Sequence, residues 1–205
     1  PLTLEEIAAV GAGVAAGLAA MHAVGLVHLD VKPENVLLDR RNGRATAVLC
    51  DFGIAEVLGE RSARLRGTPP YVAPELLHGD APSAACDLYA LGVLTYEMLT
   101  GQLPFRHEKP MDVLKAHVNE RPERPSRLKP DCDRGLEAVA LKLLEKDPVN
   151  RFQTAYETLA ALGVEVPAGI GGHLLSSPLV GHEQERALLA AQVAAVARGE
   201  PAETV

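Results

Sequence analysis

The sequence predicts a mainly α-helical fold that carries one small β-hairpin. Three stretches, residues 7–27, 84–99 and 136–144, have helical length and apolar spacing. Two short apolar runs, 36–38 and 46–50, are separated by turn residues and suit a pair of strands. At 205 residues and 47% hydrophobic content, the chain can hold one packed domain and part of a second.

Composition limits the classes of partner and the cellular compartment. The net charge of −7 argues against a nucleic-acid-binding protein, which would carry a basic face. The three cysteines, Cys50, Cys86 and Cys132, are odd in number and widely spaced, without a metal-ligand or disulfide pattern. We therefore expect reduced thiols and a cytoplasmic protein.

The stretch 7–27 is nearly uncharged and long enough for a membrane span. It is rich in Ala and Gly and contains His22, and Glu5 and Glu6 stand where a signal peptide would be positive. Its larger apolar side chains fall on one helical face. We therefore expect a helix packed in a globular core and no membrane span.

The start and end of this first helix have local signals. Thr3 and Glu6 have the spacing of a capping box, and Gly25 suits the position just past the helix end. Gly13 and Gly17 predict that another helix approaches closely.

Residues 36–38 and 46–50 are expected to pair as a hairpin around an Arg-Asn-Gly turn at 41–43, with Leu37 opposite Val48. Residues 51–75 lack sustained periodicity and are predicted to form a long ordered loop. Long loops inside compact domains are usually functional.

The second half of the chain is predicted to be helical, over 84–99, 111–119, 136–144 and 154–162. The first of these is apolar nearly all round, which is typical of a buried helix. Asp87 lies within it, so this charge must find hydrogen-bond donors.

Three motifs follow one another in a fixed order: HLDVKPEN at 28–35, DFG at 51–53 and GTPPYVAPE at 67–75. Each alone is weak, because a lone DFG is most often a turn. Together, and followed by Asp87 and Arg151, they resemble the catalytic half of eukaryotic-type (Hanks-type) serine/threonine protein kinases.

The resemblance implies ATP and Mg²⁺ as cofactors and assigns roles to five residues. Asp30 would orient the substrate hydroxyl and accept its proton, and Lys32 would contact the transferred phosphate. Asn35 and Asp51 would hold Mg²⁺ on the ATP phosphates, since Mg²⁺ prefers few, hard oxygen ligands. Lys32 together with Thr68 is the serine/threonine pattern.

Other residues are expected to support this site. Asp87 would accept backbone N–H groups of the 28–35 loop, Glu75 would pair with Arg151, and His28 would pack and hydrogen-bond. Cys50 is expected to be a buried strand residue. The surface histidines are predicted to be His107, His117 and His182.

One departure from the family pattern concerns regulation. Leu29 stands where the family usually has an arginine that pairs with a phosphate on the activation segment. Ser62 and Thr68 are the hydroxyls between Asp51 and Pro70, and Ser62 is the candidate phosphosite. We therefore expect activity to depend little on phosphorylation of Ser62.

A second departure concerns domain organisation. The sequence lacks the glycine-rich loop, the strand lysine and its glutamate partner, which cover ATP in the family. Residues 1–163 are therefore predicted to be the C-terminal lobe of a truncated, bacterial kinase, with the N-terminal lobe absent. Residues 164–178 have linker composition.

Residues 179–205 have a helical pattern that a kinase lobe does not need. The segment LVGHEQER at 179–186 resembles the start of an AAA-type NTPase domain, with His182 where arginine is usual. The alternative is a tail helix that docks on its own lobe.

Two functions remain open from the sequence. The first is a protein kinase that uses ATP to phosphorylate protein serine or threonine residues. The second is a pseudokinase or scaffold that binds signalling partners without catalysis, for which Leu29 leaves room.

Overall fold

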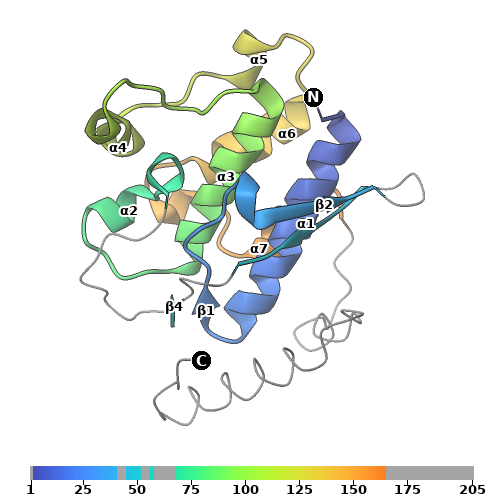
Figure 1. Cartoon of the computed structure of the whole chain (residues 1–205), viewed down its shortest axis with the longest axis horizontal. Helices are drawn as coiled ribbons and strands as arrows, with labels where there is room; N and C mark the ends of the chain where they lie inside the picture. Colours follow the sequence, from blue (N-terminus) through green and yellow to red (C-terminus); the bar gives the residue numbers. More distant parts are fainter. Residues whose placement is uncertain (1, 41–44, 52–55, 58–67, 165–205) are drawn as a thin grey trace. The chain divides into compact units, whose positions relative to one another are not determined.

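The computed structural model describes residues 2–40, 45–51, 56–57 and 68–164, which lie within one compact unit, Pro1–Gly171 (Figure 1). The described elements, in chain order, are α1 (Leu4–Ala23), β1 (Leu26–Val27), η1 (Pro33–Asn35), β2 (Val36–Asp39), β3 (Thr46–Leu49), β4 (Glu56–Val57), η3 (Pro69–Tyr71), α2 (Pro74–Leu77), α3 (Ala84–Thr100), α4 (Pro110–Asn119), α5 (Pro125–Leu128), α6 (Arg134–Leu143), η4 (Pro148–Asn150) and α7 (Ala155–Ala161).

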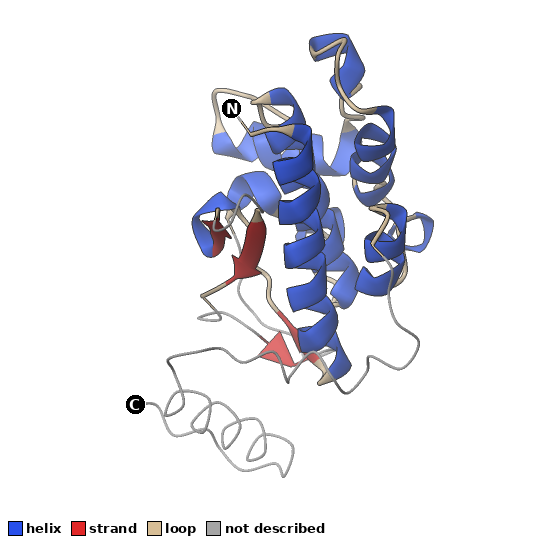
Figure 2. Cartoon of the chain, turned by 90° about the vertical axis from the view of Figure 1, so that its right-hand side faces the viewer, coloured by secondary structure: helices blue, strands red, loops and turns tan. Residues whose placement is uncertain are grey.

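Helices make up most of the described structure, as the sequence predicted, and the strands gather beside α1 (Figure 2). Helix α3 lies near the centre of the helical part and contacts both α1 and α6 (Figure 1). A Cβ atom on Gly92 of α3 would lie 2.6 Å from the Leu143 Cβ atom, so this glycine permits the close crossing of α3 and α6.

Helix α1 begins as its sequence predicts. The Thr3 hydroxyl accepts the Glu6 N–H, and the Glu6 carboxylate accepts the Thr3 N–H, which completes the capping box. The expectation that Gly13 and Gly17 face another helix is wrong. A Cβ atom on Gly13 would meet the carbonyl oxygen of Ala47, and Gly17 lies against Leu49, so the close neighbour is strand β3.

Among the described helices, α1 alone is long and apolar enough to cross a bilayer by length and composition. It packs against β3, α7 and α3, and its apolar face is buried. Val14 and Leu18 are fully buried in the main hydrophobic cluster. This packing is that of a core helix, and core helices pass the same length and hydropathy criteria.

The predicted hairpin pairing is confirmed, and a second pair of strands was not predicted. Strands β2 and β3 are antiparallel with Leu37 opposite Val48. Strand β1 pairs with β4, although residues 51–75 were expected to be a loop throughout. That stretch also contains η3 and the start of α2. The turn at 41–43 lies outside the described residues.

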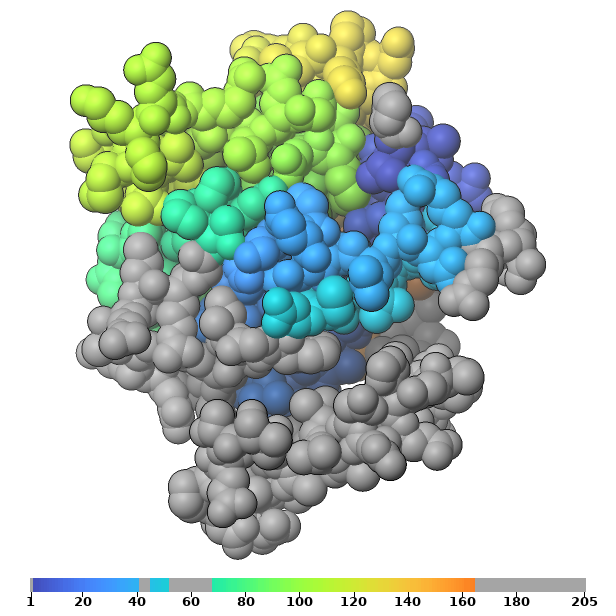
Figure 3. Space-filling model, in the orientation of Figure 1, coloured from blue at the N-terminus to red at the C-terminus, as the bar shows by residue number. Residues whose placement is uncertain are grey.

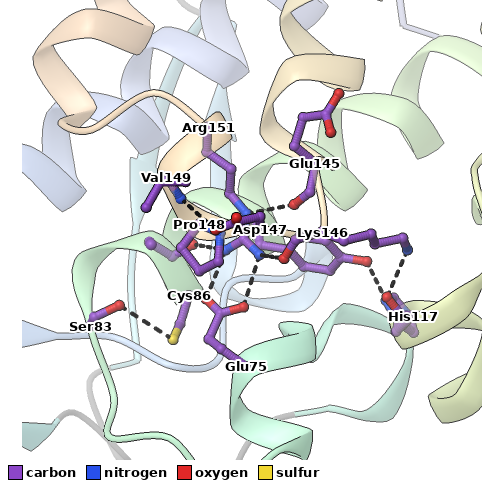
Figure 4. Close-up of polar contacts among 12 residues, drawn as sticks. Glu75, Ser83, Cys86, His117, Glu145, Lys146, Asp147, Pro148, Val149 and Arg151 are labelled. Carbon is purple, nitrogen blue, oxygen red and sulfur yellow. Dashed lines mark hydrogen bonds and ion pairs between the residues drawn. The ribbon is translucent and has the colours of Figure 1, made fainter.

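A buried ion pair joins α2 to the segment that follows α6 (Figure 4). Arg151 Nη1 and Nη2 donate to the two Glu75 carboxylate oxygens at 2.7 and 2.8 Å. The remaining three guanidinium N–H groups donate to the carbonyl oxygens of Ala85, Glu145 and Lys146. All five donors of Arg151 are thereby used, and the predicted pair is confirmed.

The expectation that His117 is a surface residue is wrong. Its side chain is fully buried between Tyr89 and Phe105, and the Tyr89 hydroxyl lies 2.8 Å from His117 Nδ1. Lys146 Nζ donates to the His117 carbonyl oxygen at 2.6 Å (Figure 4). The same ammonium group lies over the Phe105 ring. His107 is exposed, as predicted, beside Glu120.

Burial, and secondly the nearby Lys146 charge, lowers the pKa of His117 to about 4. The unfolded chain, with an ordinary histidine pKa near 6.5, therefore binds more protons between these values. We expect stability to fall as pH falls from about 6.5 to about 4, with a contribution from His117 on the order of 3 kcal/mol. Urea unfolding across this range measures the effect.

The matched variants for this prediction are His117→Asn, which keeps an acceptor near the Nδ1 position, and the surface change His107→Asn. The loss of stability as pH falls should be smaller in His117→Asn and unchanged in His107→Asn. An equal pH slope in wild type and His117→Asn would contradict the prediction.

Candidate active site

The loop of residues 28–35 is fixed by one buried carboxylate. Asp87 of α3 has no exposed surface, and its Oδ2 and Oδ1 atoms accept the backbone N–H groups of His28 and Leu29 at 2.8 and 2.7 Å. The sequence predicted this role for Asp87. A third contact, from His22 Nε2 at 2.8 Å, was not predicted.

The backbone of this loop is strained at the residue before Asp30. Leu29 has φ of +64°, a left-handed conformation that bulky residues rarely adopt. Its side chain is buried in the cluster that includes Ala73 and Tyr89. An arginine here could reach a phosphate, whereas the buried leucine packs the loop into the core.

His28 connects the loop to the segment that leads to Asp51. It is fully buried, its Nδ1 accepts the Asp30 N–H at 3.3 Å, and its Nε2 lies 3.3 Å from the Cys50 carbonyl oxygen. These contacts require a neutral imidazole with its proton on Nε2. The expected packing and hydrogen-bonding role of His28 is confirmed.

Three side chains converge on the Asp30 carboxylate. Thr68 donates its hydroxyl to Oδ1 at 2.7 Å, and Lys32 Nζ lies 2.6 Å from Oδ2. Lys32 also donates to the Thr68 hydroxyl at 3.0 Å. Asn35 Nδ2 donates to Asp30 Oδ2 at 3.0 Å and to the Asp30 carbonyl oxygen at 2.8 Å. The structure thus brings together four residues that lie up to 38 positions apart in the sequence.

These contacts set the charge of Asp30. Burial raises the pKa of the carboxyl group, but hydrogen bonds from Lys32, Thr68 and Asn35 outweigh burial and hold the pKa below its usual value. The carboxylate is therefore ionised at neutral pH. A carboxylate oxygen accepts about two hydrogen bonds, so Oδ1, which receives one from Thr68, can accept another from a substrate hydroxyl.

Asn35 and Asp51 offer oxygens suited to Mg²⁺. The Asn35 amide nitrogen points to two acceptors on Asp30, which leaves the amide oxygen for a cation. The Asn35 carbonyl oxygen accepts the Cys50 N–H at 2.9 Å, so this loop lies beside the residue that precedes Asp51. Asp51 is exposed and, like Leu29, has φ of +64°. One amide and one carboxylate suit Mg²⁺, which takes few protein ligands.

Cys50 differs from its prediction. Strand β3 ends at Leu49, and Cys50 follows it, only partly buried, with its thiol 3.3 Å from the Asn35 carbonyl oxygen. Ser62, His182 and residues 52–53 of the DFG motif lie outside the described residues.

The end of the 51–75 segment is anchored to α3 by a contact that sequence reasoning missed. Tyr71 of η3 donates its hydroxyl to Glu97 Oε2 at 2.5 Å, and its ring packs against both hydrophobic clusters. This contact fixes the turn that follows Thr68. The only available signal was a charged residue, Glu97, within an apolar helix.

The segments that carry the site residues appear on one face of the described structure (Figure 3). In Figure 3 the surface of residues 28–40, in blue, adjoins that of residues 45–51, in cyan, and that of residues 68–80 beside them.

Comparison with known proteins agrees with this geometry. A family model of the protein kinase domain matches residues 1–161. The serine/threonine-protein kinase PkaA of Streptomyces coelicolor is 41% identical over 93% of this chain and 35% of its own length. PkaB of the same organism is 48% identical over 58% of this chain and 31% of its own length. Pkn1 of Myxococcus xanthus, also a serine/threonine-protein kinase, is 38% identical over 85% of this chain and 25% of its own length.

The chain thus spans between a quarter and about a third of the length of these curated relatives. The family match covers most of the chain and includes every motif around Asp30, Asp51 and Thr68. The chain belongs to the protein kinase family.

Proposed function

We propose that the protein transfers the γ-phosphoryl group of ATP to serine or threonine hydroxyls of other proteins. The observation that carries the proposal is the Asp30 cluster, in which Lys32, Thr68 and Asn35 hold an ionised carboxylate with an acceptor position open. Membership of the kinase family and the names of the relatives support it.

Each side chain would have its own task in the transfer. A substrate hydroxyl that donates to Asp30 Oδ1 would be oriented for in-line attack on the γ-phosphorus, and Asp30 would accept its proton. Lys32, which already lies 2.6 Å from Asp30, can turn its ammonium group toward the transferred phosphate oxygens. Thr68 keeps both side chains in place through its two hydrogen bonds.

Asn35 and Asp51 would hold Mg²⁺, which neutralises negative charge on the phosphates when bound. Replacing Asp51 with alanine is expected to lower Mg²⁺-dependent phosphate transfer by about 10²-fold, because one of two protein oxygens for the metal is removed. Initial rates at increasing Mg²⁺ concentration measure this loss.

The matched control for Asp51→Ala is Asp131→Ala, which removes an exposed carboxylate outside the site. Circular dichroism should show that both variants stay folded. An Asp51→Ala protein that keeps most of the wild-type rate at every Mg²⁺ concentration would refute the metal-binding role.

Transfer itself can be tested with radioactive ATP. The full-length protein is incubated with Mg-ATP and a generic protein substrate, and the labelled product is hydrolysed for phosphoamino-acid analysis. We expect phosphoserine and phosphothreonine. Labelling confined to phosphotyrosine would contradict the assigned specificity, and no labelling at all would favour a pseudokinase.

We also infer how this chain is organised within a longer protein. Residues 1–163 would form the C-terminal lobe of a bacterial cytoplasmic kinase, because they carry the catalytic and metal-binding loops but not the family's ATP-covering motifs. Three free thiols suit that location. Residues 164–178 would be a linker, and residues 179–205 would open an NTPase domain. A phosphate-binding GxxxxGK[ST] motif in the downstream gene sequence would support the last point.

A further inference from the structure

Helix α4 is attached to the rest of the fold at its C-terminal end by Lys146. The Lys146 ammonium group donates to the carbonyl oxygens of Ala116 and His117 at 3.3 and 2.6 Å (Figure 4). A cation at this end of a helix is stabilising, because the last carbonyl groups lack partners within the helix. The His117 backbone is therefore held beside η3 and α2, against which α4 packs.

The His117 ring is buried, and its two nitrogen atoms have different surroundings. Nδ1 lies 2.8 Å from the Tyr89 hydroxyl, and Nε2 has no partner at full hydrogen-bond geometry among the described residues. Burial and then the Lys146 charge lower the pKa of the ring, whereas a weaker hydrogen bond with the Pro70 backbone raises it. Proline has no N–H group, so Pro70 can offer only its carbonyl oxygen. His117 therefore carries its proton on Nε2 and donates to Pro70, while Tyr89 donates to Nδ1.

Pro70 lies in a segment with few donors of its own. Pro69 and Pro70 both lack N–H groups, and η3 is closed by the Tyr71 N–H, which donates to the Thr68 carbonyl oxygen at 2.8 Å. The Thr68 hydroxyl in turn donates to the Asp30 carboxylate at 2.7 Å. A shift of Pro70 would therefore move the hydroxyl that holds Asp30.

A shift of Pro70 would also leave the buried Nε2–H group of His117 without an acceptor. An unpaired buried donor costs more than the lost hydrogen bond itself contributes. We propose that His117 is a positioning residue for Thr68, acting through the carbonyl oxygen of Pro70. The consequence for catalysis rests on the proposed kinase function, whereas the attachment of η3 does not.

Two variants of the full-length protein separate the roles of the two ring nitrogens. His117→Asn keeps an acceptor near the Nδ1 position and removes the donor to Pro70, while His117→Gln places an amide N–H near the Nε2 position. His107→Asn is the surface control. For each protein, kcat with a peptide substrate and the KM for ATP are measured, together with hydrogen exchange at the Tyr71 and His28 amides.

In His117→Asn we expect exchange at the Tyr71 amide to rise about tenfold, because η3 loses an attachment point. The His28 amide, which Asp87 holds, should stay within about twofold of wild type. We expect kcat to fall about tenfold, since a misplaced Thr68 no longer fixes the Asp30 carboxylate, with the KM for ATP within about twofold. His117→Gln should keep most of the wild-type exchange rate and kcat.

The proposal would be overturned by unchanged Tyr71 exchange or unchanged kcat in His117→Asn, by an equal rise at Tyr71 and His28, or by a His117→Gln protein as impaired as His117→Asn. Nitrogen NMR of the wild-type protein tests the same point without a variant. It should show the His117 proton on Nε2, and a proton on Nδ1 instead would overturn the donation to Pro70. A wild-type protein without activity would overturn the kinase function, while Tyr71 amide exchange would still test the attachment of η3.

Discussion

Replacing Arg151 with alanine is expected to lower the free energy of unfolding by about 3–5 kcal/mol. The change leaves the Glu75 carboxylate buried without its bidentate partner. It also removes the hydrogen bonds that Arg151 donates to three carbonyl oxygens and the guanidinium that lies 4.8 Å from the Tyr89 ring centre. Urea unfolding followed by circular dichroism measures the loss.

Two further variants are needed for comparison. One removes both charges of the pair, and the other removes a surface arginine. The double variant Glu75→Gln/Arg151→Met should be less destabilised than the sum of its single variants, because neither charge is then left alone. Arg40→Ala, which breaks an exposed pair with Glu6, should cost far less. An unfolding midpoint unchanged in Arg151→Ala would contradict the role of the buried pair.

Replacing Asp30 with asparagine is expected to lower the rate of phosphate transfer by about 10³-fold. Asparagine keeps the shape of the side chain and can still accept the Thr68 hydroxyl, but it cannot accept the substrate proton. It also removes the negative charge that Lys32 pairs with at 2.6 Å. Because Asp51 and Asn35 remain, binding of Mg-ATP should change little.

The fold was predicted best where the signals are local. The capping box at Thr3 and Glu6 and the pairing of Leu37 with Val48 each depend on residues close together in the sequence. The Glu75–Arg151 pair spans 76 positions and came from the family resemblance alone. Local chemistry does not identify such a distant partner.

The errors share a physical cause, because they concern which distant element covers a residue. The small side chain at Gly13 predicts a close approach but not whether a helix or strand makes it. His117 is polar on a short helix and was placed on the surface, yet Tyr89 and Phe105 enclose it. The pairing of β1 with β4 involves two residues on each side, too few for a sequence pattern.

In the candidate site, too, residues within motifs were predicted, whereas a contact from a distant helix was not. The motifs named Asp30, Lys32, Asn35 and Thr68, and the structure places them in one hydrogen-bonded cluster. Asp87 and His28, which support the cluster, were also predicted, whereas His22 belongs to no motif. His22 came to light only when α1 was seen against Asp87.

The rate of phosphate transfer by Asp30→Asn tests the central claim most directly, since the proposed chemistry depends on that carboxylate. Transfer from radioactive ATP to a serine/threonine-containing protein is measured at saturating Mg-ATP for wild type, Asp30→Asn and the surface control Asp131→Asn. We expect a loss of about 10³-fold in Asp30→Asn alone, with ATP affinity preserved. Equal labelling by wild type and Asp30→Asn would contradict the account.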